Sequence, residues 1–452
     1  GIRDIGVTGV QTCALPICSK SGAGGIVTPR TVLKGGTVVD SRGERKADVA
    51  IENGSIVEVG TSLKGEQNLD VTGCVVAPGF VDLHAHLREP GKEEAETIET
   101  GSRAGAKGGY TALVAMPNTD PAQDSVAVID FVREQGKRAG LVEVVPSGCI
   151  TLGRKGEALA PMAELAAAGV RIFTDDGNGV QDDLLMRRAM EYGKGLGITL
   201  AQHCEVSSLT KGAVMNECQC CTSLGLPGWP SIAEELMVFR DIELARLTGA
   251  RVHFLHLSTA RSVELVRAAK RDGLPVTAEV TPHHLSLDET RLTTFDTVFK
   301  VNPPLRSPHD IAALREGVLD GTIDALATDH APHPRRDKEL SLDQAPPGML
   351  GLETALGVAL GVLKIDLPHL VRVMSINPAR IAGIDDRHGR DVLPGAPANL
   401  VVFDPNATWQ VEPEQLASKS RNTPFVGMTL RGKVRHTMFN GAFTVLDGEA
   451  QR

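Results

Sequence analysis

The feature that most constrains the fold is a series of eight apolar runs, each ending in polar residues, along the middle of the chain. The runs are GFVDLHAHL, YTALVAMPN, LVEVVPSG, VRIFTDDG, ITLAQHCE, RVHFLHLS, PVTAEVTPHH and IDALATDHAPH. Stretches with the pattern of helices, such as SIAEELMVFRDIELARLTG and SVELVRAAKRDG, lie between them. Strand–helix repeats over about 300 residues predict a (β/α)8 barrel of the TIM type.

Both ends of the chain have a different texture, with short strands broken by glycine, aspartate and asparagine. We expect residues 28–78 and 388–452 to form one small β-sandwich domain beside a barrel over residues 79–387. The ENGSI stretch is a strong hairpin signal. Residues 1–27 show no periodicity and no signal-peptide layout, so we expect a non-native or disordered extension that contributes nothing to folding or activity.

The balance of charge argues against nucleic acid or an anionic membrane as the main partner. Lysine and arginine number 47 and aspartate and glutamate 56, which gives a formal net charge of −9. No apolar run approaches the roughly 18 residues of a membrane-spanning helix. An acidic chain that handles an anionic substrate needs a local cluster of positive charge.

The eight cysteines are scattered through a long chain, so we expect reduced thiols and a cytoplasmic location. Only NECQCC, residues 216–221, groups three of them. Because no second pair of Cys or His lies near it in the sequence, we expect a surface loop rather than a zinc site.

The polar residues that end the apolar runs include imidazoles and carboxylates. The carboxyl ends of barrel strands lie on one face, so these side chains are expected to converge there. Residues two apart in a strand also point the same way, as in the HAH motif. The candidates are His84, His86, Asp176, His203, His256 and Asp329. Together they predict a two-metal site for zinc-like ions.

Several motifs, taken together and in order, are more specific than any single residue. They are GFVDLHAHLREPG, AMPNTD, FTDDG, AQHCE, VTPHHL, VNPPLR and ATDHAPH. In these motifs the chain resembles the dihydroorotases of the amidohydrolase superfamily, and the bacterial class I enzymes in particular. The resemblance runs from about residue 31 to the C-terminus.

The resemblance implies two Zn²⁺ ions per subunit, bridged by Asp176 and a hydroxide. The implied ligands are His84, His86, Asp176 and Asp329 for one ion, and His203 and His256 with Asp176 for the other. Many relatives bridge with a carboxylated lysine, and here Thr174 stands at about that place. Asp175 is the rival for the bridge, since neighbouring residues alternate faces, but the match to the family motif favours Asp176.

The implied reaction is the reversible cyclisation of N-carbamoyl-L-aspartate to L-dihydroorotate in de novo pyrimidine biosynthesis. Cations depress the pKa of bound water and so generate a nucleophile at neutral pH. Asp329 is the expected catalytic proton shuttle. The alternative for Asp329 is a role as metal ligand only.

The substrate carries carboxylate, and Arg88 follows His86 on the same face, where a guanidinium suits bidentate binding. The alternative for Arg88 is a surface salt bridge with Glu89. By resemblance, the substrate contacts are His86, Arg88, Asn118, Asn302, His333 and the backbone of Pro347 and Gly348. Turn chemistry is the alternative for Asn118. The charged stretch between His333 and Met349 is expected to be a mobile lid, or else a solvated loop.

Two other functions remain open from the sequence. A dihydropyrimidinase or allantoinase shares the barrel and the metals, but its substrate lacks the ring carboxylate that Arg88 and Asn118 would bind. A non-catalytic subunit that scaffolds aspartate transcarbamoylase would be expected to lose metal ligands, and all six are present. The sequence leaves open whether the chain forms a homodimer or associates with aspartate transcarbamoylase.

Overall fold

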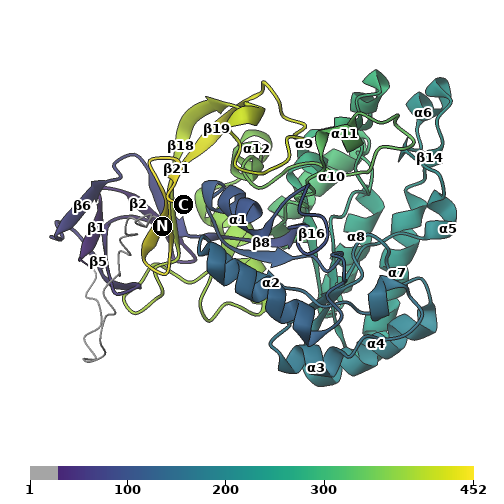
Figure 1. The fold of residues 1–452 in the computed structure, drawn as a ribbon, viewed down its shortest axis with the longest axis horizontal. Helices are drawn as coiled ribbons and strands as arrows, with labels where there is room; N and C mark the ends of the chain where they lie inside the picture. The colour runs from purple at the N-terminus through teal and green to yellow at the C-terminus, as the bar shows by residue number, and fades with distance from the viewer. Residues whose placement is uncertain (1–28) are drawn as a thin grey trace, which may run out of the picture.

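The computed structural model describes residues 29–452, so the expectation about residues 1–27 lies outside the described part (Figure 1). All eight apolar runs form strands. These are β8 (Phe80–Ala85), β9 (Tyr110–Ala115), β10 (Glu143–Pro146), β11 (Ile172–Thr174), β12 (Thr199–Gln202), β15 (Arg251–Phe254), β16 (Val276–Val280) and β17 (Ala325–Leu326).

Backbone pairing closes these strands into one ring. β8, β9 and β10 pair in parallel, and so do β11, β12, β15, β16 and β17. Two parallel bridges join the groups: Ala85 pairs with His330 beyond β17, and Gly148 beyond β10 pairs with Phe173. Because the strands are parallel, all their carboxyl ends lie on one face of the barrel.

A helix follows each strand and packs outside the barrel, as Figure 1 shows for α2, α4 and α7. The helices are α1 (Ile98–Lys107), α2 (Val126–Ala139), α3 (Met162–Ala167), α4 (Asp183–Leu196), α7 (Ile232–Thr248), α8 (Ala260–Arg271), α10 (Pro308–Leu319) and α12 (Ala355–Val362). Their apolar faces and the outward side chains of the strands form one large core. Small residues such as Ala112, Ala201 and Ala325 help to fill the barrel itself, so it is a packed core rather than a pore.

The two ends of the chain form the expected β-domain, at the left of Figure 1. One sheet has the order β5-β4-β1-β6 and the other the order β21-β20-β19-β18-β7-β2-β3. The strands are β1 (Thr31–Lys34), β2 (Thr37–Asp40), β3 (Gly43–Lys46), β4 (Asp48–Glu52), β5 (Ser55–Gly60), β6 (Gln67–Asp70), β7 (Val75–Pro78), β18 (Leu400–Gln410), β19 (Thr429–Phe439), β20 (Ala442–Leu446) and β21 (Glu449–Ala450). β18 pairs antiparallel with β7, so distant segments share one sheet. Buried side chains of both sheets, among them Leu33, Val76 and Met438, pack together.

The hairpin signal in ENGSI is also confirmed. β4 and β5 pair antiparallel around Asn53 and Gly54, whose φ angles are 48° and 80°. Positive φ at both central residues is what a two-residue turn of type I′ requires, which explains the Asn-Gly pair.

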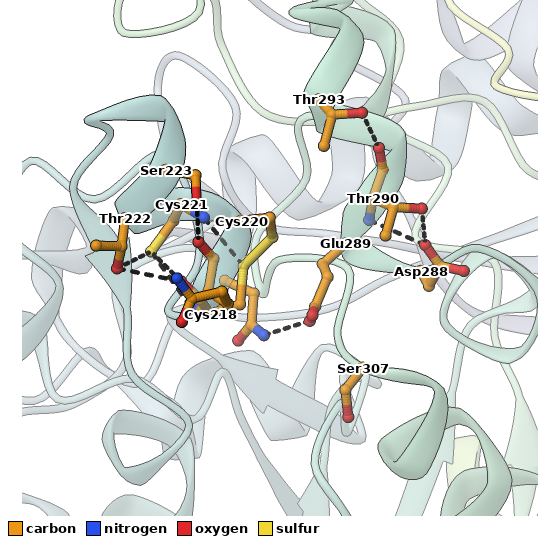
Figure 2. The surroundings of a disulfide bond; sticks show 12 residues. Cys218, Cys220, Cys221, Thr222, Ser223, Asp288, Glu289, Thr290, Thr293 and Ser307 are labelled. Carbon is orange, nitrogen blue, oxygen red and sulfur yellow. Dashed lines mark hydrogen bonds between the residues drawn. A yellow bond between two sulfur atoms is a disulfide. The ribbon is translucent and has the colours of Figure 1, made fainter.

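An insertion between β12 and α7 corrects two expectations about the cysteines (Figure 2). Cys218 and Cys220 form a disulfide. Their Cα atoms lie 5.2 Å apart, within the range that a disulfide spans. Nor is the cluster a plain loop, since Cys218 caps a short helix and the side chain of Cys221 is buried. The elements of the insertion are α5 (Ser207–Thr210), β13 (Met215–Asn216), α6 (Gln219–Leu224) and β14 (Gly228–Trp229).

The remaining elements are short and connect the larger ones. They are η1 (Leu152–Arg154), α9 (Pro282–Ser286), η2 (Glu289–Thr294), η3 (Thr297–Phe299), α11 (Arg335–Lys338), α13 (Leu367–Val371), η4 (Arg372–Ile376), α14 (Asn377–Ala382) and η5 (Pro413–Gln415). Within residues 29–452, no helix is long and apolar enough to span a membrane.

Candidate active site

The six expected metal ligands meet at the carboxyl face of the barrel. His84 lies in β8, and the others follow the ends of β8, β11, β12, β15 and β17. Each of the six is at most 6% exposed. Buried imidazoles and carboxylates need partners, because an unpaired polar group away from water is costly.

Asp176 lies at the centre of the histidines. Its two carboxylate oxygens are 3.4 Å from His84 Nε2, 3.5 Å from His86 Nε2, 3.4 Å from His203 Nδ1 and 3.5 Å from His256 Nε2. Such distances are long for hydrogen bonds. Two ligand atoms on one tetrahedral zinc ion are roughly 3.3 Å apart, given metal–ligand distances of about 2.0–2.1 Å.

The polar atoms left without partners also fit a cation. His84 Nε2 and Asp176 Oδ1 are buried and have no hydrogen-bond partner within the described chain. Two sets of three side chains offer ligand atoms within 4.8 Å of one another: His84, Asp176 and His256, and His84, His86 and Asp329. Asp176 belongs to the first set, and its Oδ2 lies 3.5 Å from His86 Nε2 of the second, so its carboxylate is suited to bridge two ions.

The neighbour of Asp176 has different partners. Asp175 Oδ1 accepts hydrogen bonds from the backbone N–H groups of Ile150 and Thr151 at 2.9 and 3.1 Å, and the Thr151 hydroxyl donates to Oδ2. Its carboxylate is thus committed to the loop after β10. Thr174, where a carboxylated lysine would stand in many relatives, is buried and its hydroxyl has no partner among the described residues.

Glu279 on β16 was missed by the sequence reasoning. Its carboxylate accepts from His84 Nδ1 at 2.9 Å and from His253 Nε2 at 3.0 Å. Burial alone would raise the pKa of this carboxyl, but His253 and His84 outweigh it and lower the pKa to about 2. A glutamate inside the apolar run PVTAEV was the available signal.

The carboxylates of the cluster are ionised at neutral pH. Burial opposes ionisation of Asp176, yet His84, His203 and His256 hold the pKa of that carboxyl well below its ordinary value. In the same way, His84 and His86 lower the pKa of Asp329. A carboxylate that stays charged in a buried site is ready to bind a cation.

Three site residues have left-handed backbone conformations. The φ angles of Arg88, His256 and Asp329 are 63°, 29° and 45°. Such angles are uncommon for residues other than glycine and tend to cluster at functional sites. At the ends of β8, β15 and β17 they turn the backbone sharply where these side chains face the cavity.

All seven expected substrate contacts line one cavity of about 160 Å³. The same cavity is lined by Asp176, His203, His256 and Asp329. Asn118 Oδ1 accepts from His86 Nδ1 at 2.9 Å, and His333 Nε2 donates to the carbonyl O of Pro347 at 2.8 Å. The cavity therefore has the metal cluster on one side and a polar wall on the other.

Arg88 supplies a buried positive charge at this wall. It is 8% exposed, its Nε donates to the carbonyl O of Pro332 at 3.1 Å, and its Nη2 is 3.3 Å from His333 Nε2. Burial lowers the pKa of Arg88 only to about 10, so the guanidinium is charged at neutral pH. The Glu89 carboxylate accepts from the amide of Ile98 instead, and Arg88 forms no ion pair with a carboxylate of residues 29–452.

Two further side chains, also missed from the sequence, hold the loop that carries Pro347 and Gly348. Lys338 Nζ donates to the carbonyl O of Pro346 at 3.0 Å and of Gly348 at 3.1 Å. Asn422, from the C-terminal segment, donates to the carbonyl O of Gly348 at 3.1 Å and accepts from the amide of His333 at 3.1 Å. The mobility expected of this stretch stays a prediction.

Comparison with known proteins places this site in a family. The family described as Dihydro-orotase-like matches residues 73–262. A dihydroorotase of Mycobacterium tuberculosis is 50% identical over 428 residues, which are 93% of this chain and 99% of the relative. A dihydroorotase of Streptomyces coelicolor is 46% identical over 428 residues, with the same shares of the two chains.

Solved structures show the same architecture at greater sequence distance. The L-hydantoinase (dihydropyrimidinase) of Arthrobacter aurescens has a TM-score of 0.84 and 25% identity, covering 94% of this chain and 98% of that one. The dihydropyrimidinase of Brevibacillus agri has a TM-score of 0.83 at 24% identity, covering 93% and 96%, and this likeness concerns the fold alone.

Proposed function

The chain belongs to the dihydroorotase family, and we propose that its site performs the reversible cyclisation of N-carbamoyl-L-aspartate to L-dihydroorotate. It is a hydrolase that acts on carbon–nitrogen bonds other than peptide bonds, on a small-molecule substrate of pyrimidine biosynthesis. The family relationship over nearly the whole chain supports this function.

The family is metal-dependent, and the clusters of His and Asp fit that chemistry. We propose two Zn²⁺ ions. The ligands would be His84, His86, Asp176 and Asp329 for one, and Asp176, His203 and His256 for the other. Bound cations supply a water of lowered pKa and polarise the amide carbonyl that reacts. Asp176 would supply the bridging carboxylate without a modified lysine.

Asp329 is the proton shuttle of the proposed reaction. Its carboxylate lies 3.1 Å from His86 Nε2 and faces the cavity. In the hydrolytic direction it takes the proton of the attacking water and delivers it to the leaving ring nitrogen. In the direction of ring closure the same carboxylate returns the proton to the departing water.

The observation that carries the substrate assignment is the buried charge of Arg88, which forms no ion pair with a carboxylate of the described chain. A guanidinium held by Pro332 can present its remaining N–H groups to a carboxylate in the cavity. Asn118, Asn302 and His333 then complete the contacts, with the backbone of Pro347 and Gly348. Hydantoin and allantoin lack a ring carboxylate and leave this charge without a partner.

One experiment separates the related activities. Metal content and turnover of N-carbamoyl-aspartate, dihydroorotate, hydantoin and allantoin are measured on the same purified protein. We expect stoichiometric metal and turnover of the first two substrates only. Turnover of hydantoin at a similar or higher kcat/KM would assign the chain to the dihydropyrimidinase activity, and metal-free, inactive protein would favour a scaffolding subunit.

A homodimer and a complex with aspartate transcarbamoylase are both compatible with an active enzyme. Light scattering of the protein alone and mixed with that transcarbamoylase distinguishes them. The cytoplasmic location stays a prediction, which the Cys218–Cys220 disulfide weakens and which cell fractionation measures.

A further inference from the structure

The insertion after β12 brings together cysteines that the reaction does not use. Cys218 and Cys220 are partly exposed and joined by a disulfide. Neither residue lines the barrel cavity. A reagent can therefore approach these two residues from solvent without passing through the active site.

A carboxylate from a distant part of the chain faces these sulfurs, as Figure 2 shows. Glu289, at the start of η2, offers an oxygen within 4.8 Å of the sulfur atoms of Cys218 and Cys220. The side-chain amide of Asn216 donates to Glu289 Oε2 at 2.6 Å. Asn216 in turn accepts from Arg306 Nη1 at 2.6 Å, and both of these residues are buried. The carboxylate is thus held in place by a buried network.

Cys221 fixes the geometry of the sulfur pair from the other side. Its backbone N–H donates to Cys218 Sγ at 3.2 Å, and its own Sγ donates to the carbonyl O of Cys218 at 3.0 Å. A hydrogen bond to a sulfur atom stabilises the thiolate over the thiol. These two hydrogen bonds to Cys221 hold the backbone turn around Cys218 in addition to the disulfide.

We propose that the reduced form of this cluster binds one thiophilic divalent cation, Zn²⁺ or Cd²⁺, through Cys218 Sγ, Cys220 Sγ and a carboxylate oxygen of Glu289. Two thiolates and one carboxylate make a donor set typical of these d¹⁰ ions, and a water can occupy the fourth tetrahedral position. The barrel centre offers only imidazole and carboxylate, so the two sites differ in chemistry.

The disulfide and the bound cation exclude each other, because each uses the same two sulfurs. A phosphine reductant attacks one sulfur and breaks the Sγ–Sγ bond. Water then supplies the oxygen of the phosphine oxide, and its two hydrogens go to the two thiols. Binding of the cation releases those two protons to solvent.

The test uses the full-length protein with the barrel site first filled with Zn²⁺. After reduction with tris(2-carboxyethyl)phosphine and its removal without air, Cd²⁺ is titrated and thiolate-to-cadmium charge-transfer absorption is recorded. We expect a band that saturates at one equivalent in the reduced protein and is absent from the oxidised protein. Ligands of the barrel cannot give this band, because none of them is a thiolate.

Variants assign the band to its donors. Cys218→Ser/Cys220→Ser should abolish it, whereas the matched control Cys13→Ser/Cys18→Ser should retain it. Glu289→Gln should keep the band but weaken Cd²⁺ affinity about tenfold or more, since even supporting residues of a metal site contribute 10- to 100-fold.

Three results would overturn the proposal: no band in the reduced protein, a band that persists without Cys218 and Cys220, or unchanged affinity in Glu289→Gln. If Cys218→Ser/Cys220→Ser fails to fold, the comparison of oxidised and reduced protein and the Glu289→Gln affinity decide the question.

Discussion

Glu279 accepts a hydrogen bond from Nδ1 of His84 at 2.9 Å inside the barrel, and this contact fixes how His84 meets the cavity. An ionised carboxylate can only accept, so Nδ1 carries the proton, and in the neutral imidazole that binds a cation Nε2 keeps its lone pair. Nε2 is the buried atom that has no partner in the described chain. Partners of this kind orient metal-binding histidines and raise their basicity.

We therefore predict that Glu279→Gln weakens metal binding by about 10- to 100-fold, since the amide lacks the charge that favours His84 as a ligand. Competition with a chelator measures the affinity. Glu353→Gln is the control, because the side chain of Glu353 is only 9% exposed but accepts from the backbone N–H groups of Ala417 and Ser418 rather than from a histidine of the metal cluster. Equal losses in the two variants would mean that Glu279 supports the fold rather than the metal.

Asp175 and Asp176 should respond differently to alanine. Asp176→Ala should lose at least one cation, because two cations would face each other without the neutralising carboxylate. Asp175→Ala leaves buried N–H groups of Ile150 and Thr151 unpaired, so it should lower the free energy of unfolding by about 1–3 kcal/mol and retain metal. Elemental analysis measures the metal content of both variants, and urea unfolding measures their stability. Metal loss in Asp175→Ala with full metal content in Asp176→Ala would exchange the two assignments.

Asp329→Asn should fold and turn over about 10²- to 10⁴-fold more slowly, because an amide cannot carry the proton. Elemental analysis of the same sample shows whether metal loss explains the change. Near-normal turnover with full metal content would rule out the shuttle and leave Asp329 as a ligand.

Arg88→Ala should reduce kcat/KM for dihydroorotate roughly 30- to 1000-fold, because the substrate carboxylate loses a charge-assisted partner. This corresponds to a loss of about 2–4 kcal/mol of transition-state stabilisation. Arg88→Lys should recover only part, since an ammonium lacks the planar fork. Neutral hydantoin is the control substrate and should not suffer the same loss. Equal losses for both substrates would place Arg88 in support of the metal site instead.

Lys338 should give the protein a specific dependence of stability on pH. Burial, with Lys300 nearby, lowers the pKa of Lys338 from 10.5 to about 7. Between these values the unfolded chain binds a proton that the folded chain has released, so the free energy of unfolding rises with pH over this window.

Lys338→Met should remove this contribution to stability. It should also raise KM, because the carbonyl O of Pro346 loses the Lys338 donor and that of Gly348 is left with Asn422. Urea unfolding at pH 7, 8 and 9 measures the first effect, and the exposed Lys364→Met serves as the control. The same pH dependence in wild type and Lys338→Met would contradict the assignment.

The sequence by itself determined the barrel, the shared β-domain and the face on which the site lies. Eight apolar runs that end in polar residues and alternate with helices predict a barrel of parallel strands. Parallel strands bring their carboxyl ends, and so these polar residues, together on one face. His84, His86 and the four other expected ligands follow from that rule before any contact is known. The Asn53-Gly54 turn is equally local, since positive φ at both residues selects the pair.

Only the tertiary structure decided which neighbours these side chains have. Asp175 and Asp176 are adjacent residues of the same type, and the direction in which each side chain points depends on how the backbone leaves β11. Glu279 meets His84 across the barrel, Asn422 reaches Gly348 from the C-terminal segment, and Glu289 approaches Cys218 from another loop. Local patterns fix backbone conformation and the buried face, whereas contacts between distant residues depend on how the complete fold packs those faces together.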